Sequence, residues 1–122
     1  MMRIIPSSIH GVLDFVVSIF VIASPWLLGF HDNSAQTWVP VTLGIATIFY
    51  SLFTRYELGA VRVIDMRTHL TLDFLSAVVL LTSPWLFGFD QRVYIPHVVI
   101  GITELLVTLL SKTKSRAFNP AA

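Results

Sequence analysis

Two histidine–aspartate pairs are the residues of this chain best suited to chemistry. His10 precedes Asp14 by four residues, and His69 precedes Asp73 by the same interval, so each pair would share one face of a helix. An imidazole beside a carboxylate can exchange protons near neutral pH. Two imidazoles with carboxylates would also suit zinc or a similar divalent ion. A metal site would, however, require four ligands to converge from different helices.

Both pairs belong to a segment that the chain contains twice. Residues 10–30 recur as residues 69–89 without a gap, and about half of the aligned positions are identical. The identical positions include the His, the Asp and the triplets Ser24-Pro25-Trp26 and Ser83-Pro84-Trp85. Similarity at a fixed offset indicates a tandem duplication. Each half of the chain must therefore be one structural unit.

The composition is typical of a membrane protein. Apolar residues make up 55% of the 122 residues, charged residues only 12%, and the mean hydropathy is +0.78; in soluble domains about a quarter of the residues are charged. Most of the charges lie between four apolar runs, at 9–30, 38–54, 68–89 and 94–110. A transmembrane helix needs about 20 such residues. We therefore predict four transmembrane helices, although two runs are short, and reject a β-barrel because the runs do not alternate.

The duplication constrains how these helices are arranged. Each repeat contains two spans, so both halves enter the membrane in the same direction and are related by an axis along its normal. Short connections favour a compact bundle of two tandem helical hairpins. Equivalent helices could lie diagonally or face each other. We expect one all-α membrane domain with repeat 1 over about 8–55, an interfacial linker over 56–67, repeat 2 over about 68–111 and a loose basic tail over 112–122.

Basic residues predict the orientation of the chain. Seven of the eight lie on one side of the predicted spans, and only Arg92 lies in a loop on the other side. Because Lys and Arg favour the cytoplasmic side of a membrane, we expect both termini in the cytoplasm. The linker is too short and charged to span, so its apolar side chains, among them Leu58, Val63 and Met66, should lie in lipid at the interface. The chain has no cysteine, which excludes disulfides and thiolate metal sites.

The Ser-Pro-Trp triplet should end the first span of each repeat. Pro25 cannot donate to the carbonyl of Val21, so the helix should bend or end there. The Ser24 hydroxyl can reach back to the carbonyl of Phe20 or Val21. Trp26 would then lie among the headgroups as an interface anchor. The same argument applies to Ser83, Pro84 and Trp85, and Trp38 and Tyr94 would complete an aromatic belt. The alternative is a lipid or quinone cleft lined by the two tryptophans.

Paired hairpins of this kind resemble a known family. A Ser-Pro-Trp near the far end of each first span, preceded by His-x-x-x-Asp, is similar to the SPW-repeat family of small bacterial membrane proteins. The resemblance covers residues from about 10 to 112. It implies an integral protein of the bacterial inner membrane. It implies no established activity, so no catalytic residues can be transferred.

A fifth polar residue is predicted to lie near the two pairs. Asp14 should lie roughly 7 to 8 Å inside the first span at 1.5 Å per residue, where a carboxylate must face the bundle and be hydrogen-bonded. Glu104 lies at a similar depth in the last span, and its counterpart in repeat 1 is Thr47, so this acid breaks the internal symmetry. The predicted buried polar cluster is His10, Asp14, His69, Asp73 and Glu104. We favour hydrogen bonds that tie the helices together over a functional site.

These observations favour a binding function over an enzymatic one. We predict a non-enzymatic accessory module that binds membrane lipids or a partner, either another membrane protein or a second copy of the chain. Neither a cofactor, nor a metal, nor nucleic acid is predicted as a ligand. The alternative is translocation of protons or small cations through the polar cluster. A second cation site made of His31, Asp32 and His97 is disfavoured, because exposed loop residues usually have no such role.

Overall fold

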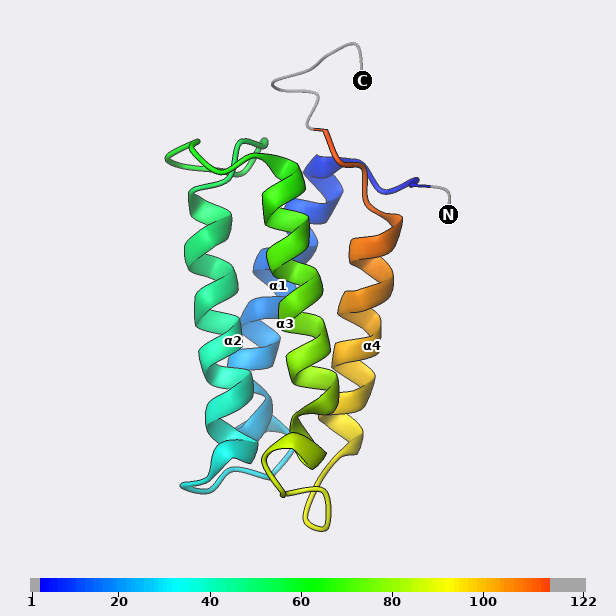
Figure 1. Ribbon diagram of the computed structural model, residues 1–122. Helices are drawn as coiled ribbons and strands as arrows, with labels where there is room; N and C mark the ends of the chain where they lie inside the picture. The colour runs from blue at the N-terminus through cyan, green and yellow to red at the C-terminus, as the bar shows by residue number, and fades with distance from the viewer. Residues whose placement is uncertain (1–2, 115–122) are drawn as a thin grey trace.

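The computed structural model describes residues 3–114, which fold into four helices. They are α1 (Ser7–Leu27), α2 (Ala35–Leu52), α3 (Met66–Leu86) and α4 (Ile95–Leu110), joined by short loops and one longer linker (Figure 1). Each helix begins and ends within a few residues of a predicted apolar run, so the all-α fold of two hairpins is confirmed. Residues 115–122 of the predicted tail lie outside the described residues.

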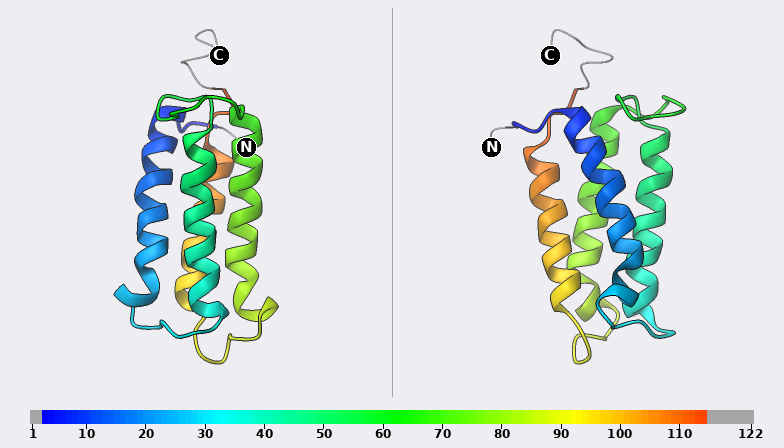
Figure 2. Two further views of the ribbon diagram at one scale, coloured as in Figure 1. Left: turned by 90° about the vertical axis from the view of Figure 1, so that its left-hand side faces the viewer. Right: turned by 180° about the vertical axis from the view of Figure 1, so that it is seen from behind.

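The equivalent helices lie diagonally across the bundle. α1 packs most extensively against α2, and α3 against α4, while α2 with α3 and α1 with α4 form smaller contacts between the hairpins. In Figure 1, α3 lies in front and α1 behind it, with α2 and α4 on either side. Figure 2 shows the same order from two other directions. The inward faces of α1 and α3 therefore meet at the bundle axis, which settles the packing order that the sequence left open.

A glycine in the second helix of each hairpin allows the two helices to approach closely. A Cβ atom on Gly44 would lie 2.6 Å from Ile22 Cγ1, and one on Gly101 would lie 2.8 Å from the backbone nitrogen of Leu81. The two glycines occupy equivalent positions in the repeats. Both hairpins therefore use the same close contact, and a larger residue at either position would require its neighbour to shift.

Two short parallel bridges close the end of the bundle at which the described part of the chain, residues 3–114, begins and ends. One joins Thr54 to Ile64 across the linker, and the other joins Ile5 to Ser111 across the two ends of the chain. We call this end of the bundle the termini end. The opposite end, which carries the two hairpin loops, is called the loop end.

The linker packs more deeply than its sequence predicts. Tyr56 is fully buried, and Leu58 and Met66 pack with it in a small core cluster. A Cβ atom on Gly11 would lie 2.8 Å from the Tyr56 ring, so this glycine makes room for it. The prediction that the apolar linker side chains face lipid was wrong for Leu58 and Met66, because Tyr56 draws this part of the linker onto the bundle. Val63 is exposed, as expected.

The distribution of polarity in the bundle differs from that in a typical soluble domain. Many of the buried side chains are polar, among them all the histidines of the helices, whereas large hydrophobic residues on all four helices are exposed. The exposed group includes Val16, Ile19, Phe49, Leu75, Ile95 and Val99. By length and composition α1 and α3, with 21 residues each, could cross a membrane, and α4 is a shorter apolar helix. Two of the four predicted spans thus meet this criterion among residues 3–114.

Candidate functional site

The two His-Asp pairs meet at the bundle axis, in the half nearer the termini end. His10 Nε2 lies 2.7 Å from Asp73 Oδ2 on the opposite helix and 3.1 Å from Asp14 Oδ1 on its own helix. His69 Nε2 repeats this pattern, at 2.7 Å from Asp14 Oδ2 and 3.1 Å from Asp73 Oδ2. We call these four residues the axial cluster. Because the shorter contacts cross from one repeat to the other, the axial cluster joins the two halves of the chain.

The axial cluster is enclosed by protein. The side chains of His10 and His69 are 1% and 0% exposed, and those of Asp14 and Asp73 are 10% and 8% exposed. The two imidazole rings meet edge to face, with centroids 5.4 Å apart. The Tyr56 ring lies against His69 at 5.3 Å. Charged groups so far from water require partners of opposite charge, which the crossed pairs provide.

A hydroxyl group orients each imidazole from behind. His10 Nδ1 lies 2.6 Å from Ser111 Oγ, and His69 Nδ1 lies 2.7 Å from Thr54 Oγ1. Each hydroxyl already donates its single proton to a backbone carbonyl of the helix that precedes it, Ser111 to Val107 and Thr54 to Tyr50. It must therefore accept from Nδ1, which carries a hydrogen. Both Nε2 atoms consequently point at the carboxylates.

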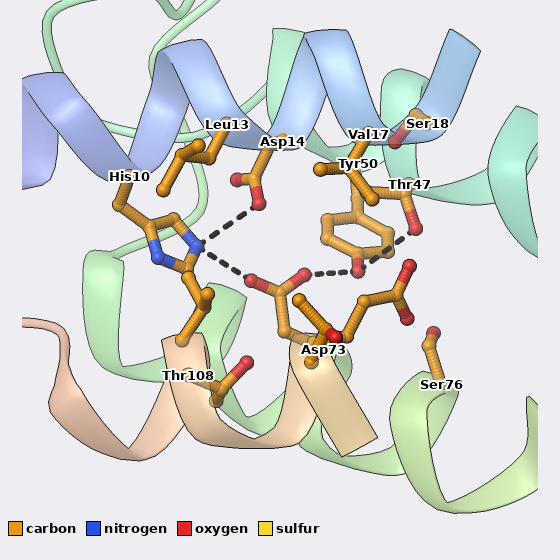
Figure 3. Close-up of a pocket in the computed structure, with 13 residues that line it drawn as sticks. His10, Leu13, Asp14, Val17, Ser18, Thr47, Tyr50, Asp73, Ser76 and Thr108 are labelled. Carbon is orange, nitrogen blue, oxygen red and sulfur yellow. Dashed lines mark hydrogen bonds and ion pairs between the residues drawn. The ribbon is translucent and has the colours of Figure 1, made fainter. Parts of the chain in front are cut away.

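The two carboxylates differ in one further contact. The Tyr50 hydroxyl donates to Asp73 Oδ1, and Figure 3 shows Asp73 held between this hydroxyl and the His10 ring. The position equivalent to Tyr50 in repeat 2 is Val107, which has no hydroxyl to offer Asp14. The symmetry of the axial cluster is therefore broken in its surroundings rather than among its four members.

A small cavity of about 40 Å³ adjoins the axial cluster. Its lining includes Asp14, Asp73, Thr47 and Glu104, and Figure 3 shows several of the lining side chains. About 10–15 Å³ of such volume accommodates one water molecule, so this polar cavity has room for water beside the carboxylates. Glu104 lines the cavity, as its predicted depth implies, but the hydrogen bonds of the axial cluster do not include it.

Three partners of the axial cluster were missed by the sequence analysis: Tyr50, Thr54 and Ser111. Thr54 and Ser111 occupy equivalent positions at the ends of the second helices, so comparing the second spans of the repeats could have found them. Tyr50 has no polar counterpart and gave no such signal. Only the packed bundle brings its hydroxyl to Asp73.

In each Ser-Pro-Trp triplet, the serine replaces the backbone hydrogen bond that the proline cannot make. The Ser24 hydroxyl donates to the carbonyl of Val21 at 2.7 Å, the group that Pro25 leaves without its backbone donor. Ser83 and Leu80 make the same 2.7 Å bond beside Pro84 in α3. The predicted bond to Val21 is confirmed. Each helix continues for two residues past its proline and then turns at a glycine with positive φ, Gly29 or Gly88.

Aromatic side chains surround the loop end. Trp26, Trp38 and Trp85 are each slightly more than half exposed, and Tyr94 lies 6.0 Å from Trp85 between ring centroids. The Trp26 ring stacks on His31. These outward-facing rings have the arrangement that the predicted interface belt requires.

His97 has a structural contact at the loop end that the sequence did not indicate. Its Nε2 donates to the carbonyl of Gln36 at 2.9 Å, the group that Pro40 leaves without a backbone donor in α2. The ring is 1% exposed and lies between Phe30 and Phe89. His97 is therefore a buried residue that joins α4 to α2, and it was wrongly grouped with the exposed loop residues.

The fold and the site together define a class of protein: a duplicated two-helix hairpin with a polar centre and an apolar exterior. The chain belongs to the SPW repeat domain family, whose sequence profile matches residues 8–111. Searches of curated proteins and of solved structures gave no match.

Proposed function

We propose that this protein is an integral protein of the bacterial inner membrane and acts as a non-enzymatic module that binds anionic lipid. All four helices would span the bilayer, with both termini in the cytoplasm. The observation that carries the proposal is the distribution of polarity in the bundle: the axial cluster is buried at its centre while large hydrophobic side chains are exposed on all four helices. An apolar exterior of this kind is suited to contact with the lipid bilayer.

A groove at the termini end supports lipid as the ligand. It encloses about 550 Å³ and is lined by Arg3 and Arg67 together with apolar side chains of α3 and α4, including Leu70 and Phe74. In the proposed orientation this groove faces the cytoplasmic leaflet. Basic pockets between helices on that side suit phosphate headgroups, while the neighbouring apolar residues suit acyl chains.

Lipid selectivity tests this proposal. The protein is reconstituted in nanodiscs of phosphatidylglycerol and phosphatidylcholine, and retained lipids are identified by native mass spectrometry. We expect a preference for the anionic lipid that falls about fivefold in Arg67→Gln, since one basic residue near a membrane surface contributes about 1 kcal/mol. Lys114→Gln removes one charge at the same end without altering the groove lining and serves as the matched control. Equal retention of both lipids would contradict the proposed selectivity for anionic lipid, and a retained second copy would favour a self-association surface.

Labelling of single cysteines tests the orientation, since the chain has none of its own. We expect a membrane-impermeant maleimide to label Asp90→Cys in intact cells, because the second hairpin loop would face outward. Ala60→Cys in the linker should react only after the cells are opened. Labelling of Ala60→Cys but not of Asp90→Cys in intact cells would indicate the opposite topology.

Translocation of protons or small cations is the second candidate. The observation that favours it is the polar cavity, in which Glu104 lies near Asp14 and Asp73 without sharing their hydrogen bonds. A dye-based flux assay in proteoliposomes tests it. If translocation occurs, Glu104→Gln combined with Asp14→Asn should abolish the flux of a correctly folded protein. Unchanged flux in that variant, or none in the wild type, would leave the axial cluster without a transport role.

A further inference from the structure

We propose that the axial cluster is a binding site for one divalent transition-metal ion of the zinc class, held by His10, Asp14, His69 and Asp73. The sequence alone argued against a metal, because four ligands would have to converge from separate helices. The folded chain removes that objection: one ligand atom from each residue lies within 4.8 Å of the others. This inference does not depend on lipid binding at the surface groove.

The spacing of the four side chains is close to what a tetrahedral ion requires. With metal–ligand bonds of about 2.0 to 2.1 Å, the ligand atoms of such a site lie about 3.3 Å apart. The imidazole nitrogens and carboxylate oxygens now lie 2.7 to 3.1 Å apart. Side-chain rotations that widen these contacts by a few tenths of an ångström, and bring closer the ligand atoms that now lie up to 4.8 Å apart, would admit an ion at their centre.

The second layer of contacts prepares the imidazoles for metal binding. Ser111 and Thr54 accept from the Nδ1 hydrogens, so both Nε2 atoms are directed at the centre of the cluster. Metal-binding histidines almost always donate their other ring hydrogen in this way, which fixes the tautomer. Tyr50 likewise holds Asp73 through Oδ1 and leaves Oδ2 facing the imidazoles. Three of the four proposed ligands thus have an outer partner.

The charges of the cluster also match a divalent ion. Without an ion, one hydrogen must lie between each Nε2 and the carboxylates, so the four side chains together carry no net charge. With an ion, two neutral imidazoles and two carboxylates balance a charge of +2. Exchange of two protons for one ion therefore leaves the net charge of a poorly solvated region unchanged, which avoids the cost of a buried net charge.

The ligand types indicate which ions fit. Two imidazole nitrogens with two carboxylate oxygens suit Zn²⁺ and related first-row ions, whereas Ca²⁺ and Mg²⁺ prefer sites made of oxygen alone. The neighbouring cavity of about 40 Å³ could supply a water molecule as a further ligand.

Metal titration of the purified, chelator-treated protein tests the proposal. Binding of Zn²⁺ and Co²⁺ is measured by equilibrium dialysis with elemental analysis, and the visible absorption of Co²⁺ reports its coordination. We expect one ion per chain, a tetrahedral Co²⁺ spectrum, and release of protons on binding. Mg²⁺ should not compete. A wild-type protein that binds no Zn²⁺, or a Co²⁺ spectrum of the hydrated ion, would overturn the proposal.

Variants locate the bound ion. The double variant His10→Gln and His69→Gln should lose binding of the ion. Asp14→Asn should bind the ion more weakly. Because it keeps an oxygen acceptor, it provides a test even if the double variant does not fold. Ser111→Ala, which touches no ion, should lower affinity about 10- to 100-fold through the orientation of His10. His31→Ala at the loop end is the matched control and should bind as the wild type does. Loss of binding in His31→Ala alone would assign the ion to an exposed histidine and overturn the proposal.

Discussion

The axial cluster and the serines of the Ser-Pro-Trp triplets are both buried and polar, yet they satisfy their polar groups in opposite ways. In the axial cluster, each imidazole makes its shorter contact with the carboxylate of the other repeat. In the Ser-Pro-Trp ends, each serine donates to a carbonyl of its own helix. One motif therefore joins the halves, and the other maintains each helix independently. Variants in the two regions should consequently differ in the size of their effects and in how those effects combine.

The largest effect is expected where the halves are joined. Asp73→Ala removes the acceptor for two imidazoles and for Tyr50, so it should lower the free energy of unfolding in detergent by about 3–5 kcal/mol, as for other broken buried ion pairs. Asp14→Ala should cost less, because Asp14 has no partner equivalent to Tyr50. An equal loss in both variants would contradict the asymmetry of their surroundings.

Coupling across the axis should be the next largest effect. Residues that share one hydrogen-bond network show interaction energies of about 0.5–3 kcal/mol in double-variant cycles. We expect His10→Gln and His69→Gln to be coupled within this range. Ser24 and Ser83 lie in separate helices, so the losses of unfolding free energy in Ser24→Ala and Ser83→Ala should add to within about 0.5 kcal/mol. Additive effects of the two histidines would show that the halves are not joined as described.

A smaller effect is expected at the serines themselves. Ser83→Ala leaves the carbonyl of Leu80 buried without a donor and should cost about 1–3 kcal/mol of unfolding free energy. Replacing Pro84 by Ala at the same time restores a backbone donor to that carbonyl. The cost of Ser83→Ala should therefore shrink in the Pro84→Ala background, as measured by thermal unfolding in detergent. An undiminished cost would indicate another role for the hydroxyl.

The smallest effect is expected at another local contact, the N-terminus of α3. Asp65 accepts from the backbone N–H of Thr68, and hydrogen bonds from the Thr68 side chain and backbone lower the pKa of this carboxyl. Because the pKa of this carboxyl is lower in the folded protein, the carboxylate stabilises the fold at a pH above its pKa in the unfolded chain, about 3.9. That stability is lost as the pH falls through the pKa in the folded protein. Asp65→Ala should cost about 1 kcal/mol or less at pH 7.

The pH dependence distinguishes this cap from a general surface effect. The greater stability of the wild type relative to Asp65→Ala should disappear as the pH is lowered from 5 toward 3, and thermal unfolding at each pH measures this difference. Asp65→Asn keeps a capping oxygen and does not titrate, so its difference from Asp65→Ala should not change with pH. A constant difference between wild type and Asp65→Ala would exclude the capping carboxylate as its source.

The sequence predicted the elements well because their causes are local. Apolar runs, prolines and the repeated triplet indicated the helices, and the Ser24 bond follows from the missing donor of Pro25. The repeat also predicted that the His-Asp pairs would face inward. It did not predict the crossed pairing of His10 with Asp73, because that depends on the diagonal placement of α1 and α3. Tyr50 and Tyr56 were missed for the same reason: their positions follow from packing between segments and not from periodicity.

The two bridges at the termini end have a consequence for the origin of the chain. Arg55 N donates to Ile64 O at 2.7 Å in the linker, and Lys112 N donates to Ile5 O at 2.8 Å between the chain ends. These bonds occupy equivalent positions in the two repeats: one lies within the linker, and the other joins segments near the two ends of the described chain. A single hairpin that met a second copy of itself would form both bonds identically, with its own His-Asp pair crossing to its twin. The fold thus has the symmetry of a homodimer of one hairpin, with the linker connecting its two halves.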